Sequence, residues 1–203
     1  MMAGAMMLSM AACGGEETTT AESTGEQKTI DGNVLDAEQY FNGYLNSEPT
    51  TLDSVTGNDT YSSSILTNAM EPLTRLAEKD GENVREGAAA ESWESNEDGT
   101  VWTFHLRDNK WSDGQPVTAN DYVYAITRVL TPETGSPNSW LLTCVKNANA
   151  VLAGEMDPSE LGVKAVDDKT IEFTLESPTP YFLALTDTRV MMPQRQDIVE
   201  QYG

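Results

Sequence analysis

The most regular alternation of apolar and polar positions lies between residues 89 and 107. Trp102, Phe104 and Leu106 alternate with smaller or polar residues, and this period of two is typical of a strand with one buried face. The preceding NEDG segment contains the residues of a tight turn, with a glycine free to adopt a positive φ. Residues 89–107 are therefore predicted to form a hairpin. A similar pattern at 161–177, with DDK at its turn, predicts a second hairpin.

A helical pattern follows residue 118. Thr118 with Asp121 three positions later resembles a capping box, with Asp in place of the usual Glu. Apolar residues then recur at helical spacing, which predicts a helix up to about residue 130. Its buried face is expected to hold Val123, Ile126 and Leu130, with Tyr122, Ala125 and Val129 alongside. The preceding Asp113-Gly114 predicts a turn. Every feature of residues 109–130 is explained by starting and packing a helix, so no chemistry is assigned to them.

The remaining elements are shorter. An aromatic-rich strand is predicted at 38–45, and a helix at 60–71 after the capping residue Asp59. A short strand is predicted at 73–77, a weaker helix near 147–154, and a helix-like stretch at 197–202. Strands and helices mix without strict βαβ alternation, which indicates an α/β or α+β domain built on a mixed sheet.

The N-terminal residues have a different composition. Residues 1–13 are small or apolar and uncharged and end at Cys13. They are too short to span a bilayer, and they are typical of the apolar part of a secretory signal that lacks its basic leader. Met10-Ala11-Ala12-Cys13 resembles the lipobox of bacterial lipoproteins, so Cys13 is predicted to carry lipid. A cysteine that follows an apolar run by chance is the alternative. The segment 14–33 is polar and is predicted to be a disordered tether.

Charge and cysteine content narrow the function classes. The chain has 12 basic and 33 acidic residues and a net charge of −21, which excludes nucleic acid as an expected partner because a polyanion requires a basic surface. The acidity is expected to keep the surface solvated, and attraction of cationic ligands is the alternative. If Cys13 is lipidated, Cys144 has no intramolecular partner. It is predicted to be a buried structural thiol, without a disulfide.

Residues for catalysis are sparse. His105 is the one histidine in the chain, and it lies in the middle of a predicted strand, where a structural role is expected. A zinc site is not predicted, because neither a second His nor a Cys cluster is present. No nucleophile elbow, phosphate-binding loop or dinucleotide fingerprint occurs. The sequence therefore predicts a protein that is not an enzyme and that holds no metal or cofactor.

Four segments occur in an order that carries a family resemblance. They are SEPTTLD (47–53), the run from Ala89 to Leu130 that contains WTFHLRDNKWSDGQPVTAND, PETGSPNSW (132–140) and LGVKAVDDKTIEFTLESPTPYFLAL (161–185). Together they resemble the oligopeptide- and dipeptide-binding proteins of ABC importers, the family 5 extracellular solute-binding proteins. The resemblance implies a periplasmic-binding-protein-like type II fold. Because family members are more than twice as long, residues 34–203 are expected to be an incomplete N-terminal lobe, with the second lobe missing.

The resemblance also implies a function. Family members capture oligopeptides or dipeptides outside the cytoplasm and deliver them to a membrane permease. This protein is accordingly expected to be a monomeric receptor, held by its lipid anchor on the outer face of the cell membrane or in the periplasm. A receptor of the same scaffold for a nickel chelate, haem, sugar or signalling peptide is the alternative. A surface chaperone or adhesion lipoprotein and an anchored enzyme are further hypotheses.

Two ligand-binding residues are implied by the same resemblance. Glu48 matches the acid that family members direct at the N-terminal ammonium of a peptide, and Trp140 falls where an aromatic residue contacts the bound peptide. A solvated loop acid and a core aromatic residue are the alternative interpretations of these two positions.

Overall fold

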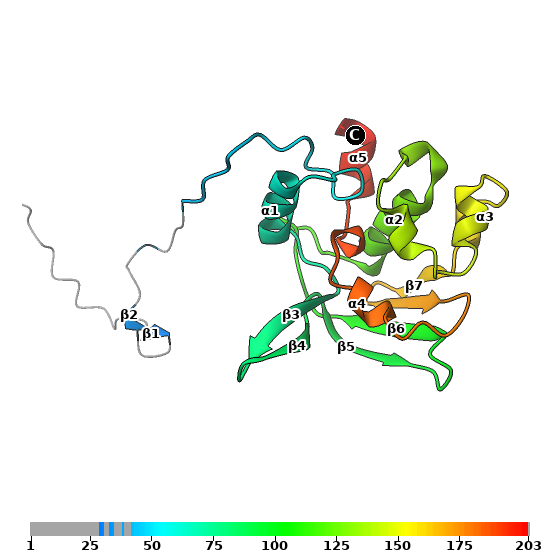
Figure 1. Cartoon of the computed structure of the whole chain (residues 1–203), viewed down its shortest axis with the longest axis horizontal. Coiled ribbons are helices and arrows are strands. Elements are labelled where there is room, and N and C mark those ends of the chain that lie inside the picture. Colours follow the sequence, from blue (N-terminus) through cyan, green and yellow to red (C-terminus); the bar gives the residue numbers. More distant parts are fainter. Residues whose placement is uncertain (1–28, 31–32, 35–37, 39–41, 203) are drawn as a thin grey trace, which may run out of the picture. The chain divides into compact units, whose positions relative to one another are not determined.

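The computed structural model describes residues 29–30, 33–34, 38 and 42–202 (Figure 1). The chain divides into two units, one up to Tyr44 and one from Leu45 onward. In the first unit, β1 (Thr29–Ile30) pairs antiparallel with β2 (Asn33–Val34). Cys13, the predicted signal segment 1–13 and residues 14–28 of the predicted tether lie outside the described residues.

The strand predicted at 38–45 is wrong for its described part. Residues 42–45 have no secondary structure, and Tyr44 is 86 % exposed. Aromatic residues favour a strand because they pack against a neighbouring strand or a covering layer. No described strand pairs with residues 42–45.

The second unit is built on a four-stranded antiparallel sheet in the order β5 (Ala90–Ser95), β6 (Val101–Leu106), β8 (Thr170–Thr174) and β7 (Val163–Asp167). Both predicted hairpins are confirmed. The turn between β5 and β6 uses Gly99 at φ 66°, as its NEDG sequence predicts. The expected combination of helices with a sheet is confirmed, and every ladder between described strands is antiparallel.

One face of this sheet forms the core. Phe104 of β6 and Phe173 of β8 are fully buried, with ring centroids 5.7 Å apart. Phe182, in the short helix α4 (Phe182–Leu185), packs against Phe173 at 5.2 Å and against Trp102 at 5.7 Å. The predicted apolar face of β6 is thereby confirmed, because Phe104 and Leu106 are buried and Trp102 is partly buried against the same core.

Helix α2 (Ala119–Leu130) contacts the same sheet along β7 and β8 (Figure 1). Its start is confirmed, because Asp121 Oδ2 accepts hydrogen bonds from the backbone N of Thr118 at 2.8 Å and from its Oγ1 at 3.2 Å. Tyr122, Ala125, Ile126, Val129 and Leu130 are buried, whereas Val123 is half-buried. The other predicted helices of this half appear as α3 (Ala148–Leu152) and α5 (Gln196–Tyr202).

The strand predicted at 73–77 is longer than expected and has a partner. β3 (Thr74–Lys79) pairs with β4 (Glu82–Gly87) through a two-residue turn, Asp80-Gly81, at φ 55° and 83°. Two positive φ values favour the Asp-Gly pair found here. The helix before it, α1 (Thr60–Ala69), has the predicted cap at Asp59 and ends before the predicted residue 71. Its early end follows from Pro72, which disfavours helical geometry at the preceding residue.

Four 3-10 helices complete the second unit. They are η1 (Pro132–Thr134), η2 (Ser139–Leu142), η3 (Pro158–Glu160) and η4 (Arg189–Met191).

Candidate ligand-binding site

The loop that contains Glu48 is exposed at its start and tightly held at its end. The Glu48 side chain is exposed, and the following Pro49 is half-buried. Asp59 Oδ2 accepts hydrogen bonds from Ser62 Oγ and from Thr50 Oγ1, both at 2.5 Å. The Ser62 hydroxyl and then the Thr50 hydroxyl hold the pKa of Asp59 well below its usual range. The helix cap therefore also anchors the loop two residues after Glu48.

A cluster of three polar side chains holds the end of this loop against α2. Arg128 donates to both carboxylate oxygens of Asp53, at 3.2 and 3.1 Å, and to Gln194 Oε1 at 2.5 Å. Gln194, which is 6 % exposed, donates from Nε2 to Asp53 Oδ1 at 2.6 Å. Burial by itself raises the pKa of Asp53, but the hydrogen bonds from Arg128, Val55 N and Gln194 outweigh it and lower that pKa. Three segments far apart in sequence are joined here.

Trp140 lies in η2 with its side chain 66 % exposed. It is therefore not a core residue. The segment just before it is bonded to the loop that follows Glu48: Ser136 Oγ donates to Val55 O at 2.7 Å, and Asn138 Nδ2 donates to Gly57 O at 3.3 Å. The residues before Trp140 are thus joined to positions 55 and 57, which follow Glu48 by seven and nine residues.

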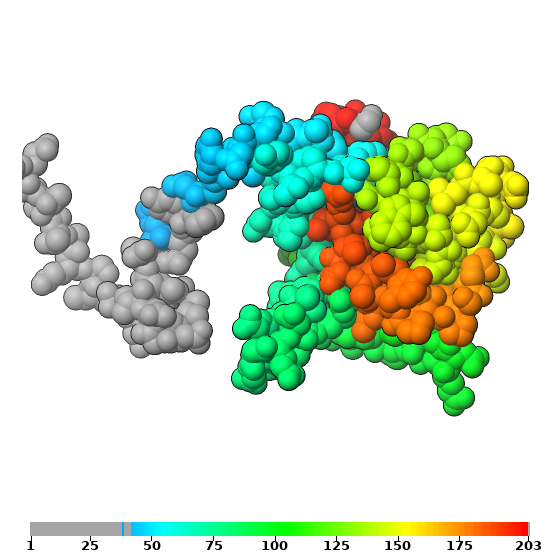
Figure 2. Space-filling model, in the orientation of Figure 1, coloured from blue at the N-terminus to red at the C-terminus, as the bar shows by residue number. Residues whose placement is uncertain are grey.

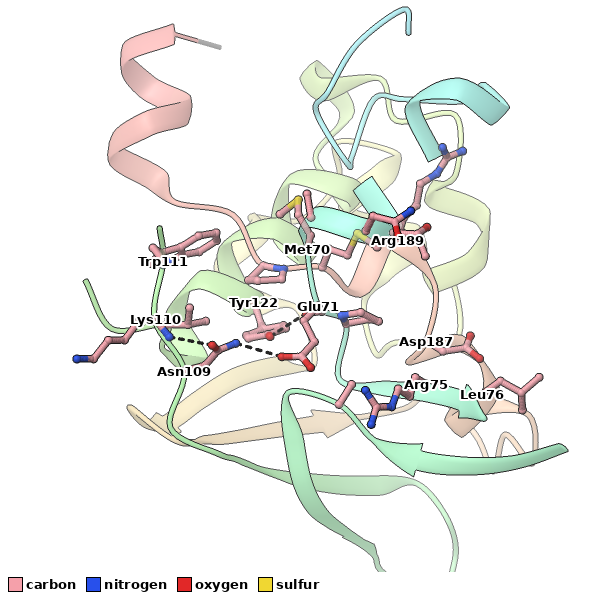
Figure 3. Close-up of a pocket in the computed structure, with 18 residues that line it drawn as sticks. Met70, Glu71, Arg75, Leu76, Asn109, Lys110, Trp111, Tyr122, Asp187 and Arg189 are labelled. Atoms are coloured by element: carbon pink, nitrogen blue, oxygen red, sulfur yellow. Dashed lines mark hydrogen bonds between the residues drawn. The ribbon is translucent and has the colours of Figure 1, made fainter. Parts of the chain in front are cut away.

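The unit that begins at Leu45 also contains a concavity, apart from Glu48 and Trp140. The surface is hollowed between α1 and the β3–β4 hairpin (Figure 2), and the hollow has a volume of about 630 Å³. Its walls come from residues 67–72, from Arg75 and Leu76 of β3, from residues 109–111 and from four positions within 187–193 (Figure 3). Glu48 and Trp140 do not line it. We call this concavity the hollow below.

The floor of the hollow is fixed by Tyr122 and Glu71. Tyr122 Oη donates to the backbone O of Glu71 at 3.0 Å (Figure 3). Burial of this phenol, and secondarily the Glu71 charge, raise the pKa of Tyr122 well above its usual value. The Glu71 carboxylate accepts from Asn109 Nδ2 at 3.1 Å and from Arg107 Nη2. Trp111 also lines the hollow, and its Nε1 is the one buried side-chain polar atom without a hydrogen-bond partner in the described part of the chain.

The residues considered for chemistry are dispersed. His105 lies on β6, where its Nε2 is 3.3 Å from Glu94 Oε1. Cys144 is half-buried, whereas a buried thiol is predicted from the sequence. Its partial burial raises its pKa. Within the residues that the structure describes, no group of three or more His, Cys, Asp or Glu side chains is placed to hold a metal ion. Over the same residues, no helix combines the length and the apolar character needed to cross a membrane.

Sequence patterns missed the hollow and the Asp53 cluster. Asp53 ends the SEPTTLD segment, but nothing near it in sequence identifies Arg128 or Gln194 as its partners. The hollow likewise draws its walls from segments separated by more than 100 positions along the chain, such as Met70 and Met192. The one local indication was Trp111, a large aromatic residue beside a solvated turn.

The sequence matches a family model and is similar to several characterised binding proteins. Residues 85–199 match the family model of bacterial extracellular solute-binding proteins, family 5 Middle. The chain is 37 % identical over 172 residues to the probable deoxycholate-binding periplasmic protein YgiS of Escherichia coli, covering 83 % of this chain and 32 % of that protein. It is 38 % identical over 172 residues to the periplasmic murein peptide-binding protein MppA of the same organism. That match covers 83 % of this chain and 31 % of MppA.

A solved structure shows the same fold. The substrate-binding domain of an oligopeptide ABC transporter from Bacillus anthracis superposes with a TM-score of 0.78 at 45 % identity, covering 83 % of this chain and 32 % of that chain. The chain thus spans about a third of the length of the curated relatives it matches. The shared fold, the family match over residues 85–199 and the sequence identity to these relatives support one assignment. This chain belongs to the bacterial extracellular solute-binding proteins of family 5.

Proposed function

We propose that the protein is the extracytoplasmic substrate-binding component of an ABC peptide importer. It captures oligopeptides or dipeptides and hands them to a membrane permease. It acts by binding, without chemical turnover of the peptide. The observation that carries this proposal is the 45 % identity and shared fold with the substrate-binding domain of an oligopeptide transporter.

The location follows from the same proposal. A receptor that serves a permease works beside the membrane, outside the cytoplasm. Cys13 is its lipidated N-terminus, and the polar segment after it is the tether that lets a monomeric domain reach the permease. Durable anchoring requires more than one acyl chain, which a diacylated cysteine supplies. Support for this anchor comes from the lipobox-like residues before Cys13.

Glu48 and Trp140 are the proposed ligand contacts. Two features support them: both residues are exposed, and the residues before Trp140 are hydrogen-bonded through Ser136 and Asn138 to residues 55 and 57, farther along the loop that contains Glu48. Glu48 recognises the α-ammonium of the peptide, and Trp140 stacks on or packs against it. Among the described residues, no Lys, Arg or His nitrogen lies within 4.0 Å of the Glu48 carboxylate.

A receptor for a different ligand is the second candidate function. The relative YgiS is described as a probable deoxycholate-binding protein, so this scaffold is associated with ligands other than peptides. The two functions make different demands, because a bile acid has no α-ammonium for Glu48 to recognise.

Titration calorimetry on the protein tests the proposal with di- to pentapeptides and with deoxycholate. We expect heat from the peptides, and an increase in the unfolding free energy of about 2.7 kcal/mol when the free peptide reaches a hundred times its Kd. Chromatography should recover the peptide unchanged. Binding of deoxycholate with no response to any peptide would favour the second function, and hydrolysed peptide would contradict a receptor.

A further inference from the structure

The hollow gathers positive charge in a strongly acidic chain. Three basic residues line it: Arg75, Lys110 and Arg189. The whole chain has only 12 basic residues, against 33 acidic ones. Such clustering matters because the local potential near a concave surface depends on the charges around it more than on the net charge.

The acids of the hollow are already engaged. The Glu71 carboxylate accepts hydrogen bonds from Arg107 and from Asn109. Asp187 Oδ2 accepts from Arg85 Nη1 at 2.9 Å. Each acid is thus paired with a guanidinium that does not itself line the hollow, and these pairs leave little negative potential there.

The bases of the hollow lack comparable partners. Arg189 donates to neutral oxygens, Ser63 Oγ at 2.8 Å and Asn58 Oδ1 at 3.4 Å. Arg75 is 3.8 Å from the Glu86 carboxylate, and its side chain is 61 % exposed. An exposed pair of this kind is weak. Lys110 has no carboxylate within 4.0 Å among the residues the structure describes.

The arrangement of these bases indicates the kind of ligand. Figure 3 shows Lys110 on one side of the hollow, with Arg75 and Arg189 on other sides, so the three do not converge on one small anion. An extended peptide advances about 3.3 Å per residue and can bring successive side chains to separate bases. Trp111, Met70 and Met192 also line the hollow and add apolar surface to it.

We propose that the hollow binds peptides rich in Asp and Glu, with their carboxylates beside Arg75, Lys110 and Arg189. This inference rests on the proposed function and adds to it a second peptide site, apart from Glu48 and Trp140, that prefers acidic peptides. An acidic protein repels such peptides at long range. A preference for them therefore requires a local basic site.

Two matched peptides, Ala-Glu-Ala-Glu-Ala and Ala-Gln-Ala-Gln-Ala, test this preference in the protein by titration calorimetry. The glutamate peptide should bind more tightly at low salt, and the difference should shrink at high salt because exposed charges are screened. Arg75→Glu and Lys110→Glu should each weaken binding of the glutamate peptide by about two- to fivefold. Binding of the glutamine peptide should be nearly unchanged. Circular dichroism confirms that both variants are folded.

Lys164→Glu is the matched control. Lys164 lies on β7, where it pairs with Glu172 away from the hollow, and the variant makes the same change in net charge. Equal binding of the two peptides by the unmodified protein overturns the inference. So does equal weakening of both peptides by the hollow variants, or an effect of Lys164→Glu as large as theirs. The proposed function survives each of these results, and fails if neither these nor other peptides bind.

Discussion

Two acids of the same loop have opposite surroundings. Glu48 is exposed, whereas Asp53 is held by Arg128 and Gln194 against α2. Such a difference separates a group that is free to meet a ligand from one whose hydrogen-bonding capacity is already used. Substitution of Glu48 is therefore expected to change ligand binding, and substitution of Asp53 to change stability.

Glu48→Gln tests recognition of the peptide ammonium. A charge-assisted hydrogen bond contributes about 1.5–3 kcal/mol, so we expect the variant to weaken peptides with a free amino group by about ten- to a hundredfold. N-acetylated peptides should be hardly affected. Calorimetry with both peptide types measures the difference. Glu97→Gln, at the exposed turn before β6, removes the same charge as a control. Equal losses for both peptide types, or no loss, would leave Glu48 as a solvated acid.

Asp53→Asn tests the polar cluster through its pH dependence. Because the folded pKa of Asp53 is lowered, its stabilisation is present above the unfolded pKa, near 4, and is lost as pH falls through the folded pKa. We expect the variant to lower the unfolding free energy by about 1–3 kcal/mol at pH 7, and the gap to narrow in acid. Urea unfolding at neutral and acidic pH measures it, with Asp98→Asn in an exposed turn as control. An unchanging gap would contradict an ionic role.

At the scale of elements, short local motifs decide where helices and turns begin. Asp121 satisfies the backbone N–H of Thr118, and Asp59 does the same for Ser62 at the start of α1. Asp80-Gly81 reverses the chain between β3 and β4 because its backbone tolerates positive φ. None of these motifs needs a distant residue.

Asp121→Ala tests the cap of α2. Loss of an N-terminal cap costs about 1 kcal/mol, and the acid also interacts favourably with the helix dipole. We therefore expect a drop in unfolding free energy of about 0.5–2 kcal/mol by denaturant titration. Asn120→Ala replaces the exposed neighbour and removes no cap. Similar destabilisation by the two substitutions would show that the effect does not come from capping.

At the scale of the whole molecule, the proposed lipid anchor sets the location of the proposed receptor. We expect that the protein expressed in a bacterial host incorporates a fatty-acid analogue, and that Cys13→Ala abolishes the label because the acylated atom is removed. Cys144→Ala should keep the label, since that thiol is half-buried in the folded domain. Equal labelling of the unmodified protein and Cys13→Ala would contradict lipidation at Cys13.

The sequence by itself determined the elements whose causes are local. Alternation around Phe104 and the NEDG turn predicted the first hairpin, and Thr118 with Asp121 predicted the start of α2. Periodicity and caps act over a few residues, so one stretch of sequence contains their whole cause. The family resemblance followed from the same stretch, and residues 85–199 match the family.

Only the tertiary structure decided what depends on distant partners. The coil at 42–45 reflects the absence of a partner strand among the described residues. The pairing of β6 with β8 and the joining of Asp53, Arg128 and Gln194 each require segments that sequence order keeps far apart. The hollow has the same origin, since its bases at positions 75, 110 and 189 come to line one concavity only after folding. Hydrophobic burial brings such segments together, and it is non-directional, so it leaves no local trace of which side chains will meet.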